Sequence, residues 1–237
     1  MIATNPADRA KPPAAKEAKA PEIHRWTAEQ LPAFLGWAHG CSDAVAYRVL
    51  AYTGMRRGEL LALRWRDLDT KGSSLSVRRS VGVVKTKGER EQLIEGSTKS
   101  GKQRSVDLDP RTVAALRDRR RARAGPDRRL APDDALIFSD LERGYLNPDR
   151  FSRRFVRSLM LARKELGADA FPMIRVHDLR HTHATLMLKA GVPVKVVSER
   201  LGHATVTITM EIYAHTLPGM QAEAAARFAA IVEGGGS

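Results

Sequence analysis

The last third of the sequence gathers side chains that could together transfer a phosphoryl group. Such chemistry needs a nucleophile, cations for the charged transition state and an acid for the leaving oxygen. In His177-Asp178-Leu179-Arg180-His181, the spacing places His177 and Arg180 on one face of a predicted helix. The planar fork of Arg180 can hold two phosphate oxygens, which a lysine does less well. His203 follows at a predicted helix end, and Tyr213 comes ten residues later.

Two upstream segments supply the remaining groups. Arg56 follows Thr53-Gly54-Met55 near a predicted helix start, and Glu59 lies one turn on, where it could orient Arg56 by a charged hydrogen bond. Lys99 lies in Thr98-Lys99-Ser100-Gly101, at a predicted strand turn, which is a mobile place for a proton donor. Lys102 could reach a similar place if the register of the turn differs.

Each of these residues also has an ordinary structural explanation. An arginine in a basic protein usually carries a solvated surface charge, and a tyrosine is more often a half-buried packing residue. His177 and His203 could cap helix ends, and Lys99 lies among several other lysines. It is the order and spacing of the whole set that favour chemistry.

Helices are expected to position most of these groups. Thr27-Ala28-Glu29-Gln30 matches a capping box ahead of apolar residues at helical spacing, although Pro32 could itself be the helix start. Asp109-Pro110 and Asn147-Pro148 each combine an N-cap residue with a proline at the first helical position. The remaining helices are expected at 43–52, 57–65, 177–190, 193–201 and from Pro218 onward.

The residue composition changes between the helical regions, and the change predicts strands. The segments 74–84, 92–94 and 104–108 are rich in β-branched and apolar residues and are separated by turns rich in Lys, Gly and Ser. This pattern predicts a small antiparallel meander. The expected fold class is therefore α+β, a mostly helical domain with one small antiparallel β-sheet.

The composition favours a polyanionic partner. Lys and Arg number 40 against 27 Asp and Glu, which gives a formal net charge of +13. Basic side chains that contact phosphates release condensed counterions, so nucleic acid is a natural partner, although a solvated basic surface would look the same. The basic residues at 117–123 and 128–129 leave this choice open, since they could face either DNA or water.

The distribution of residue types predicts three segments in a cytoplasmic protein. Residues 1–22 have no apolar period and are expected to be a linker, which suggests that something once preceded it. Residues 23–232 form one globular domain, and 233–237 are expected to be a flexible tail. The single Cys41, the lack of a long apolar run and the lack of a signal peptide favour the cytoplasm.

The motifs, taken in order, resemble those of the tyrosine recombinase, or phage integrase, family over about 23–232. The matching stretches are Thr53-Gly54-Met55-Arg56-Arg57-Gly58-Glu59-Leu60, Thr98-Lys99-Ser100, His177-Asp178-Leu179-Arg180-His181-Thr182, Leu201-Gly202-His203 and Tyr213 after Glu211-Ile212. The resemblance implies the catalytic domain of a metal-independent, site-specific DNA recombinase. Such an enzyme cuts and rejoins strands in integration or excision through a 3′-phosphotyrosine.

The resemblance also implies a role for each residue. Tyr213 would attack the scissile phosphate, Arg56 and Arg180 would clamp its oxygens, and Lys99 would protonate the departing 5′-oxygen. His177 would assist proton transfer at the tyrosine, and His203 would hydrogen-bond the phosphate. Glu59 and His181 would orient these groups without contacting the phosphate themselves.

The partners implied are a double-stranded DNA attachment site, further copies of the chain and an accessory directionality factor. Recombination would need a homo-tetramer on DNA, formed from a monomer, with no cofactor and with the segment after Tyr213 docking on a neighbour. The basic residues expected to contact DNA are Lys85, Lys87, Arg90, Lys102 and Arg104. The resemblance also implies that residues 1–22 are a linker from a missing upstream DNA-binding domain, which family members usually carry. Without that domain, DNA binding is expected to be weak and sensitive to salt.

Three other readings compete with recombination. A topoisomerase-like strand swivelase would use similar residues, and a non-catalytic DNA-binding module would need none of them. A metal-dependent nuclease could use His177 and His181, four residues apart. Arg180 would then place a positive charge beside the metal, and no suitably spaced carboxylate completes the site.

Overall fold

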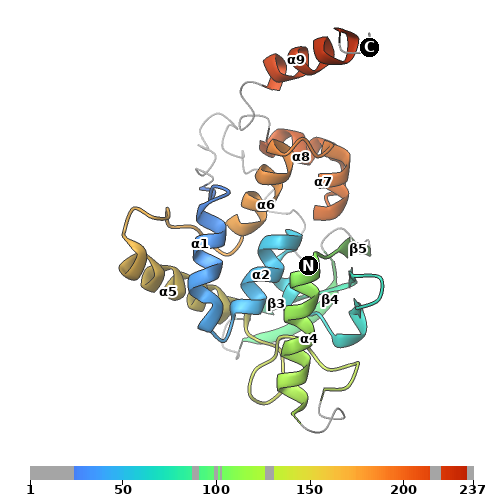
Figure 1. The fold of residues 1–237 in the computed structure, drawn as a ribbon. Helices are drawn as coiled ribbons and strands as arrows, with labels where there is room; N and C mark the ends of the chain where they lie inside the picture. Colours follow the sequence, from blue (N-terminus) through green and yellow to red (C-terminus); the bar gives the residue numbers. More distant parts are fainter. Residues whose placement is uncertain are drawn as a thin grey trace, which may run out of the picture.

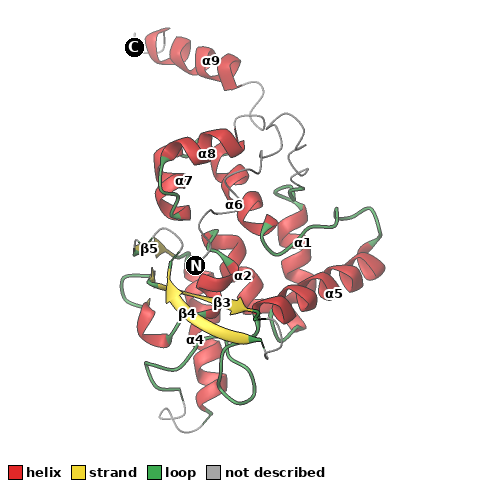
Figure 2. Cartoon of the chain, turned by 180° about the vertical axis from the view of Figure 1, so that it is seen from behind, coloured by secondary structure: helices red, strands yellow, loops and turns green. Residues whose placement is uncertain are grey.

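The domain is built mainly from helices packed around short strands (Figures 1 and 2). The computed structural model describes residues 24–86, 91–98, 101, 103–125, 131–213 and 220–233, with the backbone alone for 211–213, 220–224 and 227. The α-helices are α1 (Gln30–Trp37), α2 (Ala44–Thr53), α3 (Arg57–Leu61), α4 (Pro110–Ala124), α5 (Pro148–Leu166), α6 (Asp178–Lys189), α7 (Val194–Leu201), α8 (Val206–Tyr213) and α9 (Met220–Glu233). Two 3-10 turns are η2 (Ala38–Gly40) and η3 (Trp65–Asp67).

The strands form two small antiparallel sheets, so the α+β class is confirmed but the single meander is wrong. The strands are β1 (Leu68–Asp69), β2 (Ser74–Val77), β3 (Arg79–Val84), β4 (Gln92–Ser97) and β5 (Arg104–Asp107). One sheet has the order β1-β2-β5 and the other pairs β3 with β4. The expected strand 74–84 is divided at Arg78, where the chain leaves one sheet for the other. Buried side chains alternate with more exposed ones through the break, since Leu75, Val77 and Val81 all face the core. This alternation shows which face of a strand is buried but does not specify the strand with which it pairs.

Local sequence rules account for most of the helix starts. Thr27 Oγ1 accepts from Gln30 N at 3.3 Å while Gln30 Oε1 accepts from Thr27 N at 3.0 Å, which confirms the capping box. Pro32 therefore falls in the first turn of α1, where its missing N–H costs little. Asp109 and Asn147 cap α4 and α5 through their side chains, as expected.

The third helix is shorter than the sequence predicts. It was expected to reach residue 65 but ends at Leu61, and η3 follows after a short extended stretch. In that stretch Leu63 O accepts from Ile137 N at 2.8 Å, and Arg64 forms an isolated bridge with Leu136. Backbone pairing with a segment far along the chain therefore replaces the last helical turn.

The basic run in α4 is used largely within the protein. Arg119 donates to Ile137 O, Arg123 to Ser139 Oγ, and Arg120 to Ala131 O. Arg120 also lies over the Trp65 ring. These contacts hold the segment 131–139 against α4, which gives the run a structural purpose. The basic residues at 128–129 lie outside the described residues.

An aromatic cluster forms the centre of the core. Trp26, Phe34, Tyr47, Phe155 and Phe171 are all buried, with ring centroids 4.8–6.4 Å apart for the pairs that include Phe34. A second, smaller apolar cluster packs α6 against α7. The core thus joins the N-terminal helices to α5, and the second cluster attaches the C-terminal helices. None of the described helices is both long and apolar enough to cross a membrane.

Gly58 permits the close approach of α3 to β3, and a substitution tests this packing. A Cβ at Gly58 would lie 2.5 Å from Val81 O, a backbone atom that cannot move aside cheaply. We expect Gly58→Ala to lower the free energy of unfolding by about 1–3 kcal/mol. Urea denaturation measures the effect.

The matched control is Gly36→Ala in α1, where no atom lies within 4 Å of the new Cβ. There we expect a gain of about 0.5–1 kcal/mol from the better helix former. Equal effects at the two positions would contradict the packing argument.

Candidate active site

A left-handed glycine places Arg56 at the start of α3. Gly54 ends α2 with φ +65°, and Arg56 follows in extended conformation. A Cβ at Gly54 would lie 2.6 Å from Leu201 Cδ2 and 2.7 Å from His183 Cδ2. Because both the positive φ and the close contacts exclude a side chain, this turn requires glycine.

Glu59 is the buried centre of the site. Its carboxylate accepts from Arg56 N at 2.8 Å and from Arg56 Nη1 at 2.9 Å, which is the orienting contact expected from the sequence. Arg104 of β5 binds the same carboxylate at 3.1 and 2.6 Å. Burial alone would raise the pKa of Glu59, but the hydrogen bonds and charges of Arg104 and Arg56 hold it below its usual value.

Arg180 reaches the same place from α6. The side chain is buried, and its Nη1 donates to Gly54 O and to Leu201 O, both at 2.8 Å. These two carbonyls end α2 and α7, so Arg180 joins the turn that carries Arg56 to the turn that carries His203. The structure therefore brings Arg56, Glu59 and Arg180 into one region, between the ends of α2 and α7.

The histidines flank this group and are neutral at pH 7. His177 is the N-cap residue of α6, and its ring lies edge-on to that of His181 with centroids 5.1 Å apart. His203 follows the left-handed Gly202, and its Nδ1 lies 2.7 Å from Thr209 Oγ1 of α8. Burial lowers the pKa of His177 to about 4, and burial with the nearby Arg180 and Arg56 lowers that of His203 to about 4.

For two of the expected catalytic residues, Tyr213 and Lys99, the structure does not describe the side chain. Tyr213 is the last residue of α8, and its side chain is outside the described residues. Lys99 also lies outside them, two residues after the end of β4. The nearest described residue before it, Thr98, is buried.

Of the five residues expected to contact DNA, two are described. Lys85 is exposed and pairs with Glu91 at 2.8 Å. Arg104 is not on the surface but is bound to Glu59, with its side chain 10% exposed. Lys87, Arg90 and Lys102 lie outside the described residues.

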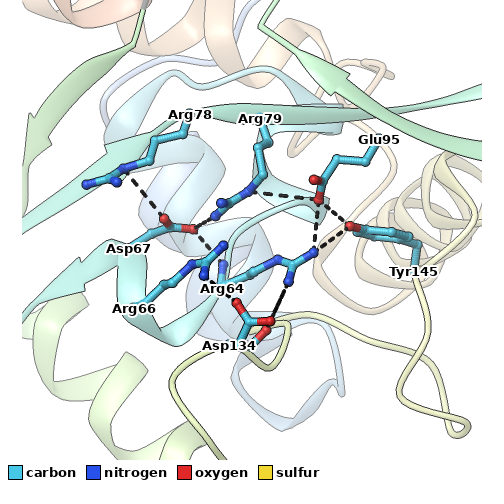
Figure 3. Close-up of polar contacts among 8 residues, drawn as sticks. All are labelled: Arg64, Arg66, Asp67, Arg78, Arg79, Glu95, Asp134 and Tyr145. Atoms are coloured by element: carbon cyan, nitrogen blue, oxygen red, sulfur yellow. Dashed lines mark hydrogen bonds and ion pairs between the residues drawn. The ribbon is translucent and has the colours of Figure 1, made fainter.

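A charged network fixes the strand that leads to Lys99 (Figure 3). Its members are Arg64, Arg66, Asp67, Arg78, Arg79, Glu95, Asp134 and Tyr145. Glu95 of β4 accepts hydrogen bonds from Arg64 Nη2 at 3.2 Å and from Tyr145 Oη. Arg64 is held in turn by Asp134 at 2.8 Å. The network thereby ties β4 to the loops before β1 and α5.

The sequence did not single out several residues that support the site. Thr209 binds His203, and its spacing six residues later carries no local pattern. His183 lies behind Gly54, with Nδ1 2.9 Å from Ala51 O and Nε2 accepting from Arg200 Nε at 3.2 Å. Among the described residues, no group of three or more His, Cys, Asp or Glu could hold a metal ion.

Comparisons with known proteins agree with this arrangement. The sequence profile of the phage integrase family matches residues 24–219. A tyrosine recombinase XerC-like protein of Caldanaerobacter subterraneus subsp. tengcongensis is 32% identical over 179 residues, which are 73% of this chain and 45% of that protein. The integrase of Mycobacterium phage D29 is 30% identical over 203 residues, 82% of this chain and 50% of that protein. The chain belongs to the phage integrase family.

Solved structures share the fold. The Tn1549 transposon integrase, in complex with a circular intermediate DNA, superposes with a TM-score of 0.73 at 21% identity, covering 88% of this chain and 67% of that chain. The catalytic domain of bacteriophage HP1 integrase gives a TM-score of 0.56 at 20% identity, covering 89% and 98%. The chain spans about half the length of the curated relatives it matches, at 45% and 50% for the two named above.

The buried His183 predicts how stability changes with pH. Burial, then Arg200, lowers the pKa of His183 from 6.5 to about 4, so between these values the unfolded chain binds a proton that the folded chain does not. The free energy of unfolding should therefore fall as the pH falls from 6.5 toward 4, by up to about 1.4 kcal/mol per pH unit for this residue. Urea denaturation at several pH values measures the slope.

The comparison variant is His183→Gln, which cannot titrate. It should show a shallower loss of stability over the same pH interval, whatever its stability at pH 7. Parallel slopes for the two proteins would contradict a neutral His183 in the folded state.

Proposed function

We propose that this chain performs site-specific DNA recombination, in integration or excision, through a 3′-phosphotyrosine on Tyr213. The observation that carries the proposal is the convergence of Arg56, Arg180 and His203 on the C-terminal end of α7. The next helix, α8, ends at Tyr213. Membership of the phage integrase family supports the proposal, and the names of the relatives favour recombination over strand swivelling.

In the proposed cleavage step, Tyr213 Oη bonds to the scissile phosphorus as the bond from phosphorus to the 5′-oxygen breaks. Arg56 and Arg180 stabilise the charge on the non-bridging oxygens, and His203 donates a hydrogen bond to them. Lys99 protonates the departing 5′-oxygen. The phosphate ester conserves the bond energy, so rejoining requires neither ATP nor a cofactor.

His177 is suited to receive the tyrosine proton. It is neutral at pH 7 because burial lowers its pKa to about 4, and its ring contacts that of His181. An approaching phosphate would stabilise the imidazolium and raise this pKa, which makes the ring a better base when DNA is bound. Glu59 supports Arg56 from behind, and His181 supports His177.

The proposed substrate is a double-stranded DNA attachment site, bound in the cytoplasm. Lys85, together with Lys87, Arg90 and Lys102, would contact its phosphate backbone, and an accessory factor could set the direction of the reaction. The net charge of +13 supports a polyanionic partner.

Covalent trapping tests the reaction. Duplexes with a nick beside a randomised core are incubated with the chain in excess EDTA, and DNA that stays attached after denaturation is recovered. We expect an adduct with the wild type and none with Tyr213→Phe, because only the phenolic oxygen can form the ester. The matched control is Tyr52→Phe, on the exposed side of α2, which should form the adduct as the wild type does.

Either of two results would contradict the proposal: an adduct that persists in Tyr213→Phe, or an adduct that forms only when EDTA is left out. Binding of the DNA without any adduct would also reject the proposal.

We also propose that α9 docks on a neighbouring copy in a tetramer assembled on DNA from monomers. Phe228, Ile231 and Val232 lie on one face of α9 and are 69%, 75% and 62% exposed. Figure 1 shows α9 apart from the rest of the domain. An apolar face of this kind is costly to leave in water, and a second copy would cover it.

A charge on this face should prevent assembly. We expect Phe228→Asp to abolish tetramers on DNA in analytical ultracentrifugation while single-site cleavage continues. Ala230→Asp is the control, because two residues turn the helix by about 200° and place this charge on the opposite face. Tetramers that survive Phe228→Asp would contradict docking through α9.

A further inference from the structure

Three arginines bind three consecutive carbonyls at the end of α7. Arg104 Nε donates to Arg200 O at 3.0 Å, Arg180 Nη1 donates to Leu201 O at 2.8 Å, and Arg56 Nη2 reaches Gly202 O at 3.4 Å. The C-terminal end of a helix carries partial negative charge on its free carbonyls, so it is a favourable place for cations. Two of these arginines belong to the proposed reaction, and the third, Arg104, has no role in it so far.

Of the two arginines that bind Glu59, Arg104 is the more buried and makes more side-chain contacts with it. Both of its terminal nitrogens bind the carboxylate, in the paired geometry that a guanidinium favours, whereas Arg56 offers Glu59 one side-chain nitrogen. The Arg104 side chain is 10% exposed and that of Arg56 is 23% exposed. Arg104 therefore fills the inner side of Glu59, and Arg56 keeps the side that is open to a phosphate.

The backbone beside His203 is fitted around Arg104. A Cβ at Gly202 would lie 2.8 Å from Arg104 Nη1 and 2.9 Å from Arg104 Cζ. Gly202 also has φ +69°, which favours glycine. The guanidinium thus lies directly against the turn that leads to His203.

We propose that Arg104 is a positioning residue of the reaction: it fixes Glu59 against the end of α7 and, through Glu59, sets the place of Arg56. This role rests on the proposed function, because its main test measures DNA cleavage. All three nitrogens of the Arg104 guanidinium are bound within the protein, which favours this role over the direct DNA contact expected from the sequence.

The test separates cleavage from binding in the 237-residue chain. On a duplex recovered by the trapping assay, single-turnover cleavage by Arg104→Gln should fall about 100-fold, since a misplacement of about 1 Å can cost that much. The Kd for the same DNA should change less than about 3-fold. Loss of a direct phosphate contact would weaken binding more than that and would also reduce its salt dependence. Arg104→Lys keeps the charge and should recover part of the rate. Arg121→Gln, an exposed arginine of α4, is the matched control and should cleave normally.

The pH profile adds a second readout, and circular dichroism at each pH separates it from a loss of folding. Without Arg104, burial raises the pKa of Glu59 with only Arg56 to oppose it. Cleavage by Arg104→Gln should therefore fall more steeply than that of the wild type as the pH is lowered from about 7.5 to 5.5.

A double variant tests whether Arg104 acts through Arg56. When Arg56→Lys is already present, Arg104→Gln should lower the cleavage rate by a smaller factor than it does alone, because both changes act on the same side chain.

Two results would overturn the inference. Cleavage equal to the wild type in Arg104→Gln would remove the role, and weaker DNA binding with a salt slope reduced by about one would identify a phosphate contact instead. If the wild type itself formed no adduct, the proposed function would fail separately. The Glu59 carboxyl titration, followed by 13C NMR without DNA, would still decide whether Arg104 controls Glu59, since the pKa should rise in Arg104→Gln.

Discussion

The site depends on one buried carboxylate that cannot remain charged alone. Glu59 is withdrawn from water, and an isolated ionised carboxylate in that position would cost several kcal/mol or would take up a proton. Two arginines from different parts of the chain meet this requirement, Arg56 from the turn after α2 and Arg104 from β5. The pairing therefore does more than neutralise a charge: it fixes Arg56 and α3 against the three-stranded sheet that contains β5.

The end of α7 is the second constraint, and it follows from the first. Three guanidiniums close together repel one another, and a single carboxylate cannot offset them all. The carbonyls of Arg200, Leu201 and Gly202 supply further negative potential. Because α8 follows immediately, the helix that orders the arginines also positions the helix that ends at Tyr213.

The strong positive charge of the chain is divided between two uses. The arginines of α4 mostly hold the segment 131–139, and Arg64 and Arg79 hold the strands of the β3-β4 sheet. Arg56 and Arg180, in contrast, converge on the candidate active site. Net charge alone therefore does not identify which basic residues are available to a polyanionic partner.

The sequence by itself determined the family, the helix starts and the identity of the main catalytic candidates. These depend on local rules, such as the capping side chains of Asp109 and Asn147, or on short motifs such as that of His177 and Arg180. Only the tertiary structure decided that the strands form two sheets, that α3 ends at Leu61, and that Arg104 binds Glu59 across 45 residues. Alternation and spacing describe which way a side chain faces along its own element. They carry no information on which distant backbone or carboxylate lies opposite, because that is set by how the whole chain packs.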